Sequence, residues 1–136
     1  MFPLYFLYDM WPVLILRLVL GIIFIAHGWP KLRDLKQNAK NFSAMGFKPG
    51  GLFGTIAALL EFFGGIALII GLGTAFFAGL FVLEFAVILV WKWSKGVSLR
   101  GENGWELDFI IFASVFALFA LGGGAYSIDR IVFGLL

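Results

Sequence analysis

Four ionisable residues lie inside segments of this chain that are otherwise apolar enough to span a membrane: Arg17, His27, Glu61 and Glu84. A charge near the centre of a bilayer costs at least ~2.5–3.5 kcal/mol. We therefore expect these residues to pair with one another or to serve a function. Carboxyl and imidazole groups in such positions can bind a proton or hydrogen-bond the polar part of a lipophilic ligand.

Arg17, Glu61 and Glu84 are expected to form a cluster near the middle of the membrane. At 1.5 Å per helical residue, each glutamate lies roughly 13–15 Å from the end of its segment, and Arg17 lies roughly 9 Å deep. Because a guanidinium group keeps its charge, we expect Arg17 to pair with one glutamate, while the other carboxyl group is neutral or hydrogen-bonded. Such a cluster could hold and release a proton. The alternative is a static ion pair or triad that fixes the order of the helices.

His27 is predicted to belong to a second polar group, near the end of its segment. Lys31 follows it by one helical turn on the same face. Glu106 and Asp108 begin the last long apolar segment and are expected at the same level of the membrane. In this group His27 could take a proton, pair with the acidic residues, or hydrogen-bond a quinone carbonyl or another polar head group. The alternative is an interfacial histidine that is satisfied by a neighbouring acid.

The overall composition indicates that the solvent of these segments is lipid. Of the 136 residues, 62% are hydrophobic and 13% are charged, and the mean hydropathy is +1.02. A soluble domain is about half apolar and a quarter charged, so we expect one all-α, integral membrane domain. The lack of cysteine excludes disulfides, thiolate catalysis and iron–sulfur ligation. We expect no metal site and, without a basic face, no binding of nucleic acid.

The apolar pattern predicts a bundle of four transmembrane helices. Pro30 is expected to end the first helix, and the run Gly122-Gly123-Gly124 to end the fourth. No lysine or arginine precedes Arg17, so the first segment is expected to be a retained helix rather than a cleaved signal. A last apolar stretch, 128–136, is too short to span and is expected at the interface. The predicted helices cover about 11–29, 52–72, 74–93 and 105–121, with loops at 30–51 and 94–104.

Lysine and arginine are distributed unevenly between the two ends of this bundle. Eight of them lie in the 30–51 loop and around the 94–104 loop, whereas the opposite side has only Arg130. The positive-inside rule therefore predicts cytoplasmic loops and both termini outside. The segment 34–44 could be an amphipathic surface helix, with Leu35, Ala39 and Phe42 directed inward, or a solvated loop.

Small residues predict where the helices approach closely. Gly21 and Gly28 are seven residues apart and share a face of the first helix. Glu61 lies between Ala57 and Gly65 in a row of the second helix. Because small residues let membrane helices pack closely, we expect Glu61 to face the interior of the bundle.

The ordered set of these residues resembles the DoxX family. The pattern R…HG..K…MG of that family is similar to Arg17, the run His27-Gly28-Trp29-Pro30-Lys31 and Met45-Gly46. Its E..GG stretch resembles Glu61-Phe62-Phe63-Gly64-Gly65. Its acidic start of the fourth helix resembles Gly104-Trp105-Glu106-Leu107, and its closing G-G-x-x-S-x-D motif resembles the run from Gly122 to Asp129.

The resemblance implies a small prokaryotic inner-membrane protein of four helices, whose namesake relatives are subunits of a thiosulfate:quinone oxidoreductase. It also implies a set of residues for ligand or proton binding, to which Glu84 is added from its depth alone. No catalytic residue is assigned. The residues implied by the resemblance are Arg17, His27, Lys31, Glu61, Glu106 and Asp129.

Three functions are consistent with these features. The first is a redox-associated subunit that binds a quinone or another lipophilic molecule; any sulfur chemistry would then come from a partner redox protein. The second is a dimeric, proton-coupled transporter of small molecules, because protonatable groups near the midplane are typical of ion pathways. The third is a non-catalytic subunit that organises partner enzymes in the lipid bilayer, with the buried charges only specifying the bundle.

Overall fold

The computed structural model describes residues 11–124 and 126–133, and these residues form helices joined by short connections, without a strand. This arrangement confirms the all-α class. The end of the apolar stretch 128–136 lies outside the described residues. The helices are α2 (Trp11–Arg33), α3 (Leu35–Ala44), α4 (Gly50–Ile70), α5 (Thr74–Ser94), α6 (Glu106–Leu121) and α7 (Ile128–Phe133).

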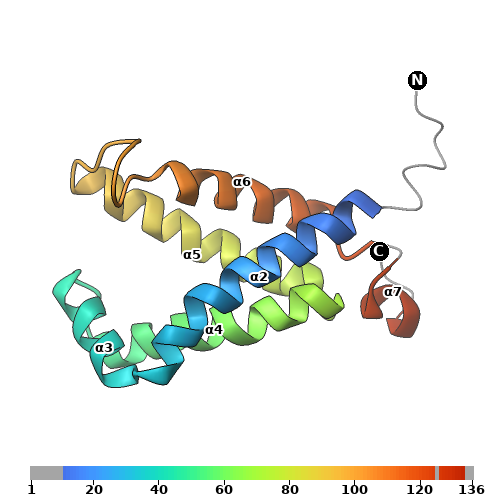
Figure 1. Cartoon of the computed structure of the whole chain (residues 1–136), viewed down its shortest axis with the longest axis horizontal. Coiled ribbons are helices and arrows are strands. Elements are labelled where there is room, and N and C mark those ends of the chain that lie inside the picture. Colours follow the sequence, from blue (N-terminus) through green and yellow to red (C-terminus); the bar gives the residue numbers. More distant parts are fainter. Residues whose placement is uncertain (1–10, 125, 134–136) are drawn as a thin grey trace.

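The four long helices alternate in direction along the chain and form two packed pairs (Figure 1). The most extensive contacts join α2 to α4 and α5 to α6, and α3 packs on the beginning of α4. One end of the bundle carries α3 and the loop between α5 and α6. The other end carries the start of α2, the turn between α4 and α5, and α7.

Three of these helices, α2, α4 and α5, are long and apolar enough to cross a membrane. The fourth, α6, has 16 residues and is therefore about 24 Å long. The prediction that Pro30 ends the first helix was wrong, because α2 continues through Pro30 to Arg33. Proline lacks a backbone N–H group, so Pro30 removes one hydrogen bond from α2. The turn that follows it is joined to α4 by the ion pair between Lys31 and Glu61.

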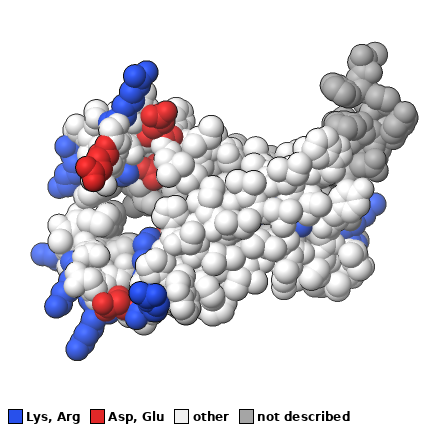
Figure 2. Space-filling model, viewed as in Figure 1, with Lys and Arg blue, Asp and Glu red and all other residues white. Residues whose placement is uncertain are grey.

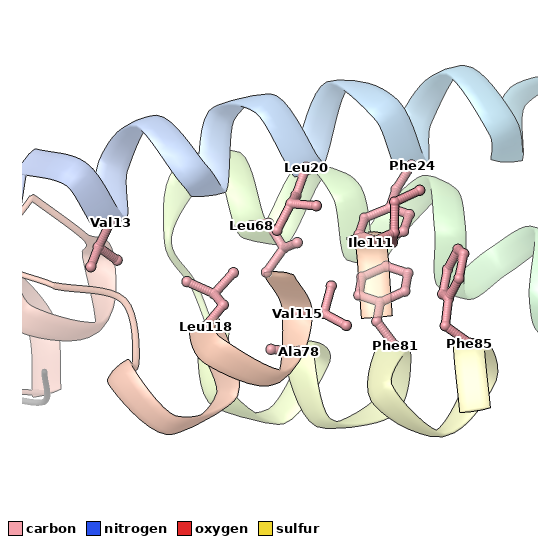
Figure 3. Close-up of a cluster of buried hydrophobic side chains, with 10 residues drawn as sticks. All are labelled: Val13, Leu20, Phe24, Leu68, Ala78, Phe81, Phe85, Ile111, Val115 and Leu118. Atoms are coloured by element: carbon pink, nitrogen blue, oxygen red, sulfur yellow. The ribbon is translucent and has the colours of Figure 1, made fainter. Parts of the chain in front are cut away.

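The core lies between the two pairs of helices (Figure 3). Phe24 of α2 stacks on Phe81 of α5 with 3.8 Å between ring centroids. Val115 and Leu118 of α6 are fully buried, and so is Leu68 of α4, so all four long helices contribute. Many other large apolar side chains point outward, as expected for helices whose solvent is lipid.

The backbones of α2 and α4 approach closely, as the row of small residues predicts. A Cβ atom on Gly21 would lie 2.7 Å from the carbonyl oxygen of Gly65, and one on Gly28 would lie 2.6 Å from the backbone nitrogen of Phe62. At the same crossing, that Cβ atom on Gly28 would lie 2.9 Å from the Cβ atom of Glu61. Any larger residue at position 28 would therefore separate the two helices.

The segment 34–44 is helical, which excludes the loop alternative. Asp34 caps α3 by accepting a hydrogen bond from the backbone N–H of Gln37. The inward face differs from the prediction, because Leu35 is exposed and Asn38 is buried. The amide of Asn38 donates to the carbonyl oxygen of Gly54, so α3 is fastened to α4 rather than only to a membrane surface.

Charged side chains gather at the end of the bundle that carries α3 and the α5–α6 loop (Figure 2). The long middle part of the surface in this view is almost free of charge. The charge distribution therefore distinguishes the two ends of the molecule, and the apolar belt between them has the character of a lipid-facing surface.

Candidate functional site

Arg17 is 1% exposed and donates four hydrogen bonds, all to backbone carbonyl groups. Its Nε atom is 2.9 Å from the oxygen of Leu68, and Nη2 is 3.1 Å from that of Ile69. Its Nη1 atom is 2.7 Å from the oxygen of Gly123 and 3.1 Å from that of Tyr126. The guanidinium group thus fastens the start of α2 to the end of α4 and to the segment that leads into α7.

The prediction that Arg17 pairs with Glu61 or Glu84 is therefore wrong. The last carbonyl groups of a helix have no partner within the helix, and they attract a cation. Since α2 and α4 are antiparallel, the start of α2 lies beside the end of α4. Glu61 lies seven residues before Leu68, so it is about 10.5 Å farther from Arg17 along the axis of α4. The free carbonyl groups are the nearer partners.

Asp129 lies at this same end of the bundle and caps α5. Its two carboxylate oxygens accept hydrogen bonds from the backbone N–H groups of Gly73, at 2.7 Å, and Thr74, at 2.9 Å. Its own backbone N–H donates to the carbonyl oxygen of Gly71 at 2.9 Å. These bonds satisfy the free N–H groups at the start of α5. Asp129 therefore belongs to a structural clasp with Arg17, far from the other predicted site residues.

Lys31 is the partner of Glu61. Its Nζ atom lies 2.7 Å from Glu61 Oε1, and the side chains of Lys31 and Glu61 are 29% and 3% exposed. The ammonium group also lies 5.8 Å from the ring centroid of Phe42 in α3. Sequence reasoning placed Lys31 with His27. The signal for the observed pair was Gly28, which marks the level at which α2 crosses α4 beside Glu61.

Glu84 of α5 completes a second cluster, the Lys31–Glu61–Glu84 cluster. Its carboxyl group is a neighbour of that of Glu61, and both Glu61 and Lys31 act on it electrostatically. The Oε2 atoms of Glu61 and Glu84 are both enclosed and have no hydrogen-bond partner among the described residues. Glu84, whose expected depth in the membrane matched that of Glu61, therefore lies beside Glu61.

His27 lines a cleft of about 840 Å³ at the charged end of the bundle, between α2, α5 and α6. Glu106 and Asp108 line the same cleft, so the structure brings together three members of the predicted His27 group. Lys31 is not among the lining residues. The wall formed by α6 is largely apolar and includes Leu107, Phe109, Ile110 and Ala113.

The polar groups of this cleft are arranged so that one ring nitrogen of His27 is available. The Nδ1 atom of His27 is 2.8 Å from the carbonyl oxygen of Ile23. A carbonyl oxygen can only accept, so Nδ1 carries a hydrogen and Nε2 of the neutral ring is an acceptor. Within the described residues, no hydrogen bond joins His27 to Glu106 or Asp108. The histidine is thus satisfied by its own helix rather than by an acid.

Lys92 is a cleft residue that sequence reasoning missed. Its Nζ atom is 2.5 Å from Asp108 Oδ2 and 3.3 Å from the carbonyl oxygen of Gly104. The available signal was that Lys92 ends one long apolar segment while Asp108 begins the next. The cleft therefore offers an acceptor on His27 and an ammonium donor on Lys92. No three His, Cys, Asp or Glu side chains of the described ranges are placed to hold a metal ion.

Comparison with known proteins identifies relatives over most of the chain. The family model described as DoxX matches residues 12–93. "Inner membrane protein YqjF" of Escherichia coli (strain K12) is 33% identical, over 88% of this chain and 91% of that protein. "Putative oxidoreductase CatD" of Bacillus subtilis (strain 168) is 28% identical, over 88% of this chain and 86% of that protein. No solved structure matches. The match over more than half of the chain shows that this membrane protein belongs to the DoxX family.

Proposed function

We propose that this protein is an inner-membrane, redox-associated subunit that binds a quinone, or another lipophilic molecule with a polar head group, in the His27 cleft. The observation that carries the proposal is His27 itself, whose ring lines a cleft with an apolar wall and uses Nδ1 for its own helix, which leaves Nε2 as the acceptor. Cofactor and substrate sites are typically concave, mostly apolar and provided with a few directed polar groups. The cleft volume of about 840 Å³ falls in the range of such sites.

The polar groups suit both oxidation states of a quinone. The neutral His27 ring can accept a hydrogen bond from a quinol hydroxyl group at Nε2, and Lys92 can donate to a quinone carbonyl group. A protonated His27 would donate at Nε2 instead, so a proton on this ring would change which form is bound better. Phe109 and Ile110 offer apolar surface to the ring or its tail.

The relatives support a location and a redox association for this chain. The name of the Escherichia coli protein contains the words "inner membrane", and that of the Bacillus subtilis protein contains the word "oxidoreductase". The chain has no cysteine, so any sulfur chemistry would be carried out by a partner protein. We therefore propose a binding subunit rather than a self-contained enzyme.

Binding of a short-chain ubiquinol analogue to the protein in nanodiscs tests this proposal. We expect His27→Ala to weaken binding about tenfold, because a hydrogen bond of ~1–1.5 kcal/mol is lost. Ser114→Ala is the matched control, since Ser114 is on α6, does not line the cleft and bonds its own helix. Equal binding by the two variants would contradict the proposal.

A proton-coupled transporter is the second candidate, and the contact between Glu61 and Glu84 favours it. In proteoliposomes, a transported compound would release protons on addition, and Glu61→Gln or Glu84→Gln would abolish the release. Proton release that is absent across a broad panel of amphiphilic cations and acids would count against this candidate.

We also propose that the end of the bundle that carries α3 and the His27 cleft faces the cytoplasm. The support is the excess of lysine and arginine at that end. In this orientation both termini lie outside, and the cleft exchanges its ligand with the cytoplasmic leaflet.

A further inference from the structure

We propose that Glu61 and Glu84 bind one proton between them, beside Lys31, and that these residues form an internal proton-binding site separate from the His27 cleft. The ligand of this site is a proton that exchanges with water at the exposed edge of Lys31. The inference does not depend on the identity of the molecule in the cleft, because neither glutamate lines it.

The first argument is the contact between the two carboxyl groups. Glu61 extends from α4 and Glu84 from α5, their carboxyl groups are neighbours, and each has an enclosed Oε2 atom without a partner among the described residues. A carboxylate is only an acceptor, so two carboxyl groups can share a hydrogen bond only when one of them carries a proton. Paired acidic groups in enzymes likewise hold a single proton, because two like charges so close together cannot both ionise.

The second argument is the charge of the surroundings. The charged groups that act on Glu84 are Glu61 and Lys31. The side chains that α6 adds to the core, such as Ile111 and Val115, are buried and apolar. The buried polar side chain of α3, Asn38, is neutral and bonds a backbone carbonyl group of α4. One ammonium, one carboxylate and one carboxylic acid make a neutral site, whereas two carboxylates would leave a negative charge in a poorly hydrated place.

The third argument comes from two oxygen atoms without partners. Glu61 Oε2 and Glu84 Oε2 are enclosed and accept no hydrogen bond from any described residue. Buried polar atoms in folded proteins nearly always have a partner. A hydrogen on one carboxyl group, directed at the other, provides one donor for these oxygens. Release breaks that O–H bond, leaves the electron pair on the glutamate, and passes the proton to water near Lys31, whose side chain is 29% exposed.

Infrared spectroscopy of the membrane-embedded protein tests this inference, because a carboxylic acid has a carbonyl stretching band that a carboxylate lacks. Near neutral pH we expect one such band from the wild-type chain. Labelling with ¹³C-glutamate should shift this band, because the band comes from a glutamic acid. The chain has four glutamates, and two of them, Glu102 and Glu106, are exposed at the charged end, so the band is assigned to Glu61 or Glu84. The label also assigns the band without relying on a variant that fails to fold.

The variants give the second measurement. Glu84→Gln and Glu61→Gln should each abolish the band, because the remaining carboxylate then pairs with Lys31 alone. Glu106→Gln and His27→Ala should keep it, so loss of quinol binding in His27→Ala leaves this inference intact. A wild-type spectrum without the band, a band that the glutamate label does not shift, or a band that persists in both glutamine variants would each overturn the inference.

Discussion

Lys31 and Glu61, thirty residues apart in the sequence, form an ion pair of 2.7 Å where α2 crosses α4. This pair places the ammonium group of the carboxyl cluster at the edge of the bundle rather than at its middle. Helical side chains point toward the N-terminus of their helix, so Lys31 reaches back from the last turn of α2 to the level of Gly28. The pair joins the last turn of α2, beyond Pro30, to the middle of α4.

Replacing Lys31 by methionine should destabilise the bundle. Glu61 is 3% exposed and would lose its charged donor, which we expect to cost about 1.5–3 kcal/mol in the free energy of unfolding. Unfolding in mixed micelles followed by circular dichroism measures the change. The control Lys36→Met lies on the exposed side of α3 and should change the free energy by less than ~0.5 kcal/mol. A similar loss in both variants would argue against a structural role for the pair.

Replacing Gly28 by alanine should separate α2 from α4. The added Cβ atom would lie 2.6 Å from a backbone nitrogen of α4, and backbone cannot move aside without shifting the helix. We expect a loss of about 1–3 kcal/mol, as for overpacked cores. Gly51→Ala is the matched control, because nothing lies within 4 Å of a Cβ atom at that helical position. That control should be neutral or stabilising by up to ~1 kcal/mol; a stable Gly28→Ala variant would show that the helices do not cross here.

Replacing Asp129 by alanine should affect stability and leave ligand binding unchanged. The variant frees the N–H groups of Gly73 and Thr74, and loss of a helix cap costs about 1–2 kcal/mol. Asp129→Asn keeps one acceptor oxygen and should lose less. Thermal unfolding and quinol binding are measured on the same samples. Weakened quinol binding with unchanged stability would mean that Asp129 belongs to the ligand site after all.

The orientation in the membrane can be tested with single cysteines, because the chain has none of its own. Lys36→Cys, at the α3 end, should react with a membrane-impermeant maleimide only after the cells are permeabilised. Arg130→Cys, in α7 at the opposite end, should react in intact cells. The reverse pattern would place both termini in the cytoplasm and would contradict the positive-inside assignment.

The sequence by itself determined the all-α class of this protein and its apolar segments of transmembrane length. Apolar runs of transmembrane length need no tertiary information, because lipid selects them by composition. The uneven lysine and arginine distribution and the glycines of the α2–α4 contact were equally visible. The residues Glu61 and Glu84 were also expected near each other, because their depths agree.

Only the tertiary structure decided which charges meet. The depth of a residue gives its position along the membrane normal. It does not tell how each helix is rotated about its own axis or how far it is shifted past its neighbour. The close contacts of Gly21 with Gly65 and of Gly28 with Glu61 set that register. They leave Arg17 beside the free carbonyl groups at the end of α4 and bring Lys31 to Glu61. The partners of the buried charges therefore follow from backbone packing between helices, a long-range property that no single segment contains.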